Sequence, residues 1–320
     1  MTDAHQDIQS IKVACVGAGN VGRSWAIVFA KAGCLVTLYD ISADSLARAK
    51  IAIKVSLDDL VANGLLDDAT TTFARLFFTT DMAQAVADVD YVQESIVENV
   101  EAKREIFSAL GQHTRSDTIL ASSTSAIAPS LFADAAAAPE RCLVAHPLNP
   151  PHVIPVVELC PAEETTPFAM ERAQHILASA GMEPVVLKRE IDGFVLNRLQ
   201  TAVMAEAFHL IGSGVCSPMD IETAMTKGLA RRWAFIGPFM TGHLNASHGY
   251  REYYEALGPM FRRLAEDLDP QYPWTAESVA AVRDAMESQV PVDQVGEAQV
   301  KRDQRLMQLT EHLGKHNGDD

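Results

Sequence analysis

Residues 11–33, IKVACVGAGNVGRSWAIVFAKAG, place three glycines between a run of apolar residues and a helical stretch. In this context Gly17 permits a tight turn, Gly19 lets the backbone approach a pyrophosphate, and Gly22 allows a helix to pack closely on a strand. The start of that helix offers oriented N–H groups and a positive dipole end to an anion. The stretch therefore predicts a dinucleotide site rather than a plain strand-turn-helix. Its predicted cofactor-binding residues are Gly17, Gly19, Asn20, Val21 and Gly22.

The end of the next apolar run, LVTLYDIS at 35–42, indicates which dinucleotide is bound. Asp40 can accept hydrogen bonds from both ribose hydroxyls of an adenosine and would repel a 2′-phosphate. No arginine follows it immediately. We therefore predict NAD rather than NADP as the cofactor, although a capping role for Asp40 at the next helix fits the same position.

Short runs rich in Val, Ile and Leu alternate with longer helical stretches from Ile11 to about Leu187. This alternation is typical of a parallel sheet covered by helices on both faces. The predicted fold class is therefore α/β, a Rossmann-type doubly wound and mostly parallel sheet. Strands are predicted at 11–16, 34–39, 75–79, 91–94, 118–122, 141–145, 153–159 and 184–187. Helices are predicted at 21–32, 44–63, 101–110 and 166–180, each ended by a glycine: Gly33, Gly64, Gly111 and Gly181.

After Asp192 the alternation stops and only helical patterns remain. The first of these has an unusually wide apolar face, which predicts burial against the first domain or a second subunit. The predicted domains are a dinucleotide-binding domain at 1–189 and an all-α substrate and dimerisation domain at 190–320, with a frayed polar tail from about 313. The predicted helices of the second domain lie at 193–211, from 218 to 228, onward to about 265, and at 275–288.

The composition argues against several classes of function. The chain has 320 residues, of which 48% are hydrophobic and 21% charged, and its formal net charge is −16. No basic run is long enough to follow a phosphate backbone, so nucleic acid is not an expected partner. The five cysteines are scattered without a CxxC pair, which is typical of core residues in a reducing compartment. With no basic-then-apolar leader and no run of 18 apolar residues, we expect a cytoplasmic protein without a membrane anchor.

Seven motifs, in order along the chain, carry a resemblance to a known family. Together they make the sequence similar to the 3-hydroxyacyl-CoA dehydrogenase superfamily from about residue 11 to beyond 260. Within it, the sequence resembles the lambda-crystallin and L-gulonate 3-dehydrogenase branch more than the enzymes that act on CoA esters. The motifs are GAGNVG (17–22), ESIVENVEAKREIF (94–107), SSTSAIAPS (122–130), AHPLNPP (145–151), PVVEL (155–159), GFVLNRLQ (193–200) and RRWAFIGPFMTGHLN (231–245).

The resemblance implies a catalytic pair, His146 and Glu158. Oxidising a secondary alcohol needs a base that takes the hydroxyl proton while a hydride leaves the same carbon. An imidazole suits this task near neutral pH, and a carboxylate on its other nitrogen fixes the tautomer and stabilises the imidazolium. Without the resemblance, His146 would be interpreted as a strand-end histidine bonded to backbone. Glu158 would either face water or have a fixed cationic or donor neighbour, for which His146 is the nearest candidate.

The resemblance also assigns Ser125 and Asn197 to the reacting oxygen, where both would donate hydrogen bonds. Ser125 alone is equally consistent with a cap of the short helix that Pro129 enters, and Asn197 with a polar residue in the first turns of a helix. Glu98 and Lys103 match positions near the nicotinamide, its phosphates or the substrate. Their alternative interpretation is a solvated pair near a helix start.

Histidines outside this set carry no predicted function. His152 lies near the pair in sequence but outside the matched catalytic position. The others show no spacing with Cys, His or carboxylate residues that would fix a zinc geometry, so no metal is predicted.

The substrate is the least determined part of the resemblance. A free 3-hydroxy acid needs a cation for its carboxylate, ideally a guanidinium that forms two parallel hydrogen bonds. Arg232 matches the arginine of the gulonate-type pattern and Arg231 lies beside it; both are otherwise surface arginines paired with acids. An L-gulonate-like acid is favoured, while a 3-hydroxyacyl-CoA, L-carnitine, a short 3-hydroxy acid and a non-catalytic, crystallin-like NAD(H)-binding protein stay open. The family also implies a homodimer through the helical domain.

Overall fold

The computed structural model describes residues 7–268 and 274–316. Its contacts divide the chain into two compact units. Of the described residues, one unit contains 7–197 together with 301–316, and we call it the sheet unit. The other is Arg198–Val300, which we call the helical unit.

Most of the last helix belongs to a different unit than the predicted domain division implies. The sequence predicts residues 301–316 as part of the second domain, 190–320, yet they belong to the sheet unit. Met307 is buried in the core of that unit, and Thr310 Oγ1 donates a hydrogen bond to Val153 O at 3.1 Å. An amphipathic pattern shows that a helix covers a core, but it does not say which core.

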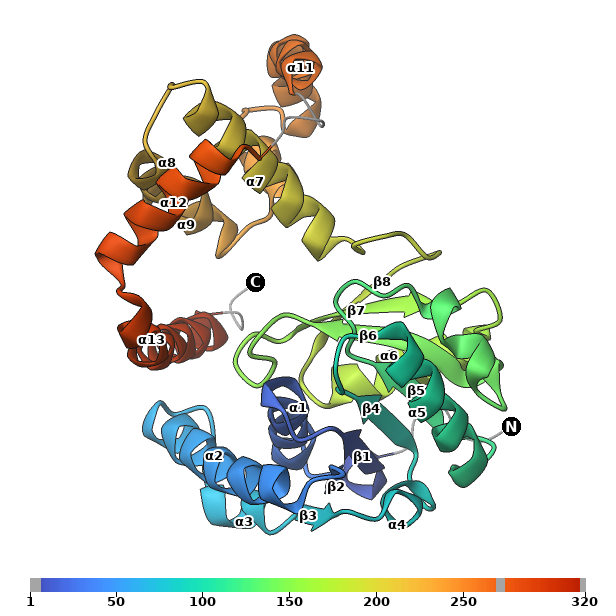
Figure 1. The fold of residues 1–320 in the computed structure, drawn as a ribbon. Helices are drawn as coiled ribbons and strands as arrows, with labels where there is room; N and C mark the ends of the chain where they lie inside the picture. Colours follow the sequence, from blue (N-terminus) through green and yellow to red (C-terminus); the bar gives the residue numbers. More distant parts are fainter. Residues whose placement is uncertain (1–6, 269–273, 317–320) are drawn as a thin grey trace. The chain divides into compact units, whose positions relative to one another are not determined.

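An eight-stranded sheet forms the centre of the sheet unit (Figure 1). The strands are β1 Lys12–Val16, β2 Leu35–Tyr39, β3 Leu76–Thr79, β4 Tyr91–Glu94, β5 Ile119–Ser122, β6 Cys142–Pro147, β7 Val156–Pro161 and β8 Glu183–Val186. Their order is β3-β2-β1-β4-β5-β6-β7-β8, and neighbours are parallel except for the antiparallel pair β6 and β7. The predicted doubly wound, mostly parallel sheet is therefore confirmed.

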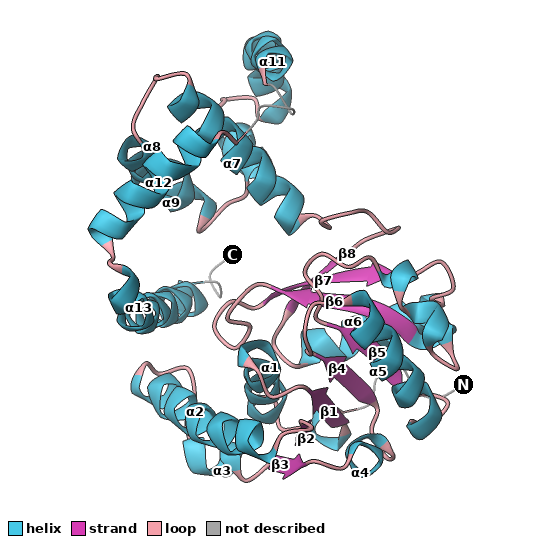
Figure 2. Cartoon of the chain, in the orientation of Figure 1, coloured by secondary structure: helices cyan, strands magenta, loops and turns pink. Residues whose placement is uncertain are grey.

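Helices connect the strands of this sheet (Figure 2). They are α1 Asn20–Lys31, α2 Ala43–Ala62, α3 Ala69–Phe73, α4 Met82–Val86, α5 Val100–His113 and α6 Pro167–Ser179. The prediction missed α3 and α4 because five residues are too few for a helical period to show. The predicted helix end at Gly111 is wrong, since α5 continues to His113. A Cβ at Gly111 would lie 2.6 Å from Ala137 N, so this glycine permits close packing instead.

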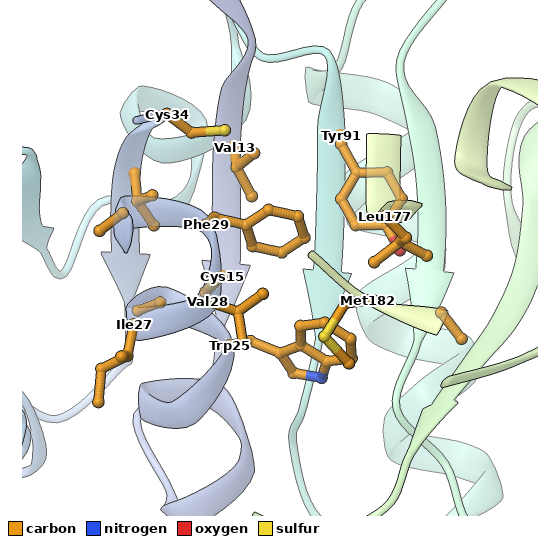
Figure 3. Packing of buried hydrophobic residues seen from close by; sticks show 14 of the residues in the cluster. Val13, Cys15, Trp25, Ile27, Val28, Phe29, Cys34, Tyr91, Leu177 and Met182 are labelled. Atoms are coloured by element: carbon orange, nitrogen blue, oxygen red, sulfur yellow. The ribbon is translucent and has the colours of Figure 1, made fainter. Parts of the chain in front are cut away.

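Residues of β1 alternate between two covered faces of the sheet. Val13 and Cys15 belong to a buried cluster with α1, α2 and α6 (Figure 3). Ala14 and Val16 belong to a second buried cluster with α4 and α5. This two-sided burial explains why the run before the glycines is apolar throughout.

The helical unit confirms the predicted all-α domain within the part of the chain that the structure describes. Its first helix begins later than predicted because Gly193 and Phe194 have a left-handed backbone, with φ of 72° and 50°. The C-terminal helix extends to His316, and the rest of the predicted frayed tail lies outside the described residues. No described helix has both the length and the apolar character needed to span a membrane. The helices are α7 Leu196–Gly212, α8 Pro218–Ala224, α9 Ala230–Trp233, α10 Pro238–Leu244, α11 Tyr250–Asp267 and α12 Ala276–Gln289. The next helix, α13 Val295–His316, begins in the helical unit and continues into the sheet unit.

Candidate active site

The glycine-rich turn joins β1 to α1 at the carboxyl end of the sheet. Gly17 has a φ of 103°, and a Cβ there would lie 2.5 Å from a backbone oxygen of the loop after β4. A Cβ at Gly22 would lie 1.8 Å from Gly17 O, so the first turn of α1 packs directly on the loop. At Gly19, in contrast, a Cβ would meet nothing within 4 Å. This open side of the turn, next to the first N–H groups of Asn20 and Val21, is the cradle that a pyrophosphate needs.

Asp40 follows β2 and holds the same turn. Its Oδ2 accepts a hydrogen bond from Ala18 N at 2.8 Å, and its Oδ1 accepts one from Ser42 N at 2.9 Å. Asp40 does not cap α2, because the N-cap of that helix is Ser42. A pocket of about 440 Å³ opens beside it, with a lining that includes Gly17, Ile41, Met82, Ile96 and Ile106. Apolar walls with a carboxylate at one edge suit an adenosine, so the residues present fit NAD.

His146 and Glu158 occupy paired positions on the antiparallel strands β6 and β7. Residues paired across such strands point to the same face, and His146 Nδ1 lies 2.8 Å from Glu158 Oε2. Both side chains are buried. Because a carboxylate only accepts hydrogen bonds, Nδ1 carries a proton and Nε2 is the nitrogen left for a ligand.

The second oxygen of Glu158 binds the start of α7. Glu158 Oε1 accepts hydrogen bonds from Val195 N at 2.6 Å and Leu196 N at 2.9 Å. The ring of Phe194, the residue just before them, has its centre 5.5 Å from that of the His146 imidazole. Three donors therefore satisfy a carboxylate in the middle of an apolar strand, which offsets much of the cost of burying its charge.

Ser125 and Asn197 meet in the sheet unit, where Asn197 Nδ2 donates a hydrogen bond to Ser125 O at 2.6 Å. Ser125 does not cap the 3₁₀ turn that begins at Pro129. Its backbone N–H instead donates to Glu98 Oε1 at 2.9 Å, and the Thr124 hydroxyl donates to the same oxygen. The four predicted catalytic residues are therefore connected. His146 contacts Glu158, which binds the backbone at the start of α7, where Asn197 lies. Asn197 in turn binds Ser125, whose N–H binds Glu98.

Lys103 is buried rather than solvated, and it pairs with a residue that the sequence analysis missed. Its Nζ lies 3.0 Å from both carboxylate oxygens of Glu94 and 3.5 Å from Glu98 Oε2. A signal for this pair was present in the sequence. Glu94 ends a buried strand, and Lys103 shares the inward face of α5 with Phe107, four residues later.

The pKa of the Glu98 carboxyl lies below its ordinary value of 4.5. Burial by itself raises this pKa, but the Thr124 hydroxyl, the Lys103 ammonium and two backbone N–H groups together lower it by more. The charged form of Glu98 therefore holds the loop that carries Ser125.

Three predicted or considered candidates remain, Arg231, Arg232 and His152. Arg231 and Arg232 are exposed residues of α9 in the helical unit, and they are not part of the hydrogen-bonded chain described above. His152 lines a separate pocket of about 210 Å³ together with Lys31 and other residues, and burial lowers its pKa to about 4. In residues 7–268 and 274–316, no group of three or more His, Cys, Asp or Glu side chains is arranged to hold a metal ion.

Comparison with known proteins finds relatives along most of the chain. Residues 12–191 match the model of the 3-hydroxyacyl-CoA dehydrogenase NAD-binding domain, and residues 193–272 match that of the 3-hydroxyacyl-CoA dehydrogenase C-terminal domain. The chain is 39% identical over 304 residues to a lambda-crystallin homolog of Bos taurus, covering 93% of this chain and 94% of that protein. It is 32% identical over 314 residues to an L-carnitine dehydrogenase of Bacillus cereus, covering 95% of this chain and 93% of that protein. The solved structure of 5-formyl-3-hydroxy-2-methylpyridine 4-carboxylic acid 5-dehydrogenase, an NAD+-dependent dismutase, aligns with a TM-score of 0.81 and 27% identity, covering 95% of this chain and 98% of that one.

Proposed function

Because the chain belongs to the 3-hydroxyacyl-CoA dehydrogenase family and has NAD as its cofactor, we propose that it oxidises the 3-hydroxyl group of a free 3-hydroxy acid, of the L-gulonate type, to a 3-keto acid. One observation carries the proposal: the buried contact of 2.8 Å between His146 Nδ1 and Glu158 Oε2. With Nδ1 committed to the carboxylate, His146 Nε2 is the base that takes the hydroxyl proton. Glu158 stabilises the imidazolium that forms. When bound, NAD accepts the hydride that leaves the same carbon.

Ser125 and Asn197 hold the reacting oxygen in this proposal. Asn197 Nδ2 uses one of its two hydrogens on Ser125 O, which leaves the second for a ligand. The side chain of Ser125 is exposed and offers a hydroxyl. Two such donors polarise the carbonyl of the keto acid in the reverse reaction.

A free acid is favoured over a CoA ester by the names of two similar proteins. One is called L-carnitine dehydrogenase and the other acts on a pyridine 4-carboxylic acid, so both names describe small molecules with a free carboxylate. We assign Arg232 as the anchor of this carboxylate, with Arg231 beside it, because a guanidinium can form two parallel hydrogen bonds to a carboxylate.

The test is a panel of four compounds, each mixed with NAD and the purified protein, with NADH formation measured by absorbance. The compounds are L-gulonate, L-carnitine, 3-hydroxybutyrate and 3-hydroxybutyryl-CoA. The proposal expects turnover with the polyhydroxy acid and none with the CoA ester. Turnover with L-carnitine or the CoA ester alone would replace the proposed substrate. NADH binding without turnover on any compound would favour a crystallin-like binding protein.

We also propose that the chain forms a homodimer through the helical unit. Support comes from an exposed apolar stripe on α11, which we define as Tyr254, Leu257, Phe261 and Leu264. These residues recur at intervals of three and four, so they share one face of the helix. An exposed apolar face of this length is typical of a surface that another chain covers.

A further inference from the structure

A set of buried and half-buried polar side chains lies next to the glycine-rich turn. Tyr91 OH donates a hydrogen bond to Gln93 Oε1 at 2.7 Å, and Gln93 Nε2 donates to Ser123 Oγ at 2.7 Å. Trp25 Nε1 donates to the same Ser123 oxygen at 3.1 Å, and Ser95 Oγ lies 2.9 Å from it. Figure 3 shows the rings of Trp25 and Tyr91 within the surrounding apolar cluster. Neither serine was among the residues predicted from the sequence.

The direction of each hydrogen bond follows from a count of hydrogens. Trp25 Nε1 can only donate. Gln93 Nε2 also lies 3.2 Å from Ala145 O, which can only accept, so this amide atom is the donor to Ser123. Ser123 Oγ therefore accepts two hydrogen bonds and gives its own hydrogen to Ser95 Oγ. Ser95 is then an acceptor in this set, and its own hydrogen has no other acceptor within the described part of the chain.

Ser95 lies where the strand order reverses. That point falls between β1 and β4, which end at Val16 and Glu94, and doubly wound sheets bind their dinucleotide in the crevice there. The backbone oxygen of Ser95 would lie 2.5 Å from a Cβ on Gly17, and its Cβ would lie 3.4 Å from one on Gly22. The side chain of Ser95 is partly exposed, so its free hydrogen is accessible to a ligand.

We propose that the Ser95 hydroxyl donates a hydrogen bond to the pyrophosphate–ribose segment of bound NAD, and that Ser123 sets the direction of that bond. Phosphate and ribose oxygens both accept hydrogen bonds, and a donor whose orientation is already fixed loses little freedom when the ligand arrives. The adenosine end of the cofactor is recognised beside Asp40, so it does not depend on Ser95. The inference rests on NAD as the cofactor and not on the identity of the acid.

Substitution of Ser95 by alanine removes this donor. In Ser95→Ala the dissociation constant of NADH, measured by fluorescence titration without substrate, should rise roughly 3- to 10-fold. ADP-ribose, which contains the same segment, should lose affinity by the same factor when it competes with NADH, while adenosine should compete as before. Ser123→Ala should cause a smaller loss of NADH affinity, because Ser95 keeps its hydrogen but not its fixed orientation.

A matched control separates this role from loss of a buried hydroxyl in general. Thr118 Oγ1 donates to Val89 O at 2.7 Å at the opposite end of β5, so Thr118→Val should leave NADH affinity unchanged. An unchanged NADH dissociation constant in Ser95→Ala would overturn the inference. So would an equal loss of adenosine affinity, since that indicates a distorted site. A substrate panel without turnover would contradict the proposed function but not this inference, because the NADH titrations contain no acid substrate.

Discussion

Several large aromatic side chains are fully buried in the sheet unit, whereas several in the helical unit are exposed. In the sheet unit Trp25, Phe29 and Phe107 are fully buried. In the helical unit Phe235 and Phe239 are 65% and 75% exposed. These aromatic side chains of the sheet unit thus lie in its own core, whereas those of the helical unit lie on its surface.

Charged groups show the same contrast. Lys103 and Glu94 form a buried pair in the sheet unit, whereas Arg231 and Arg232 of the helical unit are exposed. A buried pair keeps its geometry whether or not a ligand is bound, because separating its charges is costly. An exposed arginine takes up a fixed position only when a partner orders it. Under the proposed function, the chemistry is preset in the sheet unit, while substrate choice and assembly depend on the helical unit.

The largest expected effect tests whether the chemistry belongs to the sheet unit. His146→Gln removes the proposed base, so kcat should fall by roughly 100- to 10,000-fold. The NADH dissociation constant should change little, because the glycine-rich turn and Asp40 are intact. Steady-state kinetics and NADH titration measure the two quantities. A kcat within about tenfold of the wild type would remove His146 from the mechanism.

The next effect tests whether the helical unit depends on a second copy. Phe261→Asp places a charge in the exposed apolar stripe, and the dimer dissociation constant should rise at least roughly 30-fold. Analytical ultracentrifugation over a dilution series measures this change. Ala256→Asp adds the same charge to α11 away from the stripe and should leave assembly unchanged. Equal behaviour of the two variants would mean that this face is not the interface.

A smaller effect sharpens the division between substrate choice and chemistry. Arg232→Met removes the proposed carboxylate anchor, so the KM for the free acid should rise roughly tenfold or more while the KM for NAD stays constant. Arg231→Met is the matched control on the same helix and should change the KM for the acid much less. If both variants keep the wild-type KM for the acid, the anchor lies elsewhere.

The smallest effect concerns the loop that carries Ser125. The pKa of Glu98 is lowered in the folded state, so Glu98 stabilises the protein above its unfolded pKa, and this contribution is lost as the pH falls through the folded pKa. Because the side chain is 42% exposed, the contribution should stay below about 1 kcal/mol. The free energies of unfolding of wild type and Glu98→Gln should therefore differ at pH 6, and the difference should shrink as the pH falls below the ordinary carboxyl pKa of 4.5. A gap that widens on acidification would contradict this assignment.

Much of the sheet unit was predictable because its signals are local. Eight strands follow from short apolar runs, and Gly22 is required by its contact with Gly17 O within one strand-turn-helix. Gly111 was misinterpreted because a helix end and a close approach to another segment both favour glycine. The short helices α3 and α4 left no periodic signal.

By itself the sequence determined the doubly wound sheet, the dinucleotide turn and the residue types of the site, because short motifs encode local geometry. Only the tertiary structure decided that Glu158 also binds the backbone at Val195 and Leu196, and that Lys103 pairs with Glu94. It likewise decided that residues 301–316 pack on the sheet unit. The physical reason is that a buried charge takes whichever donors the packing brings to it, and tertiary packing, not sequence distance, sets which donors those are.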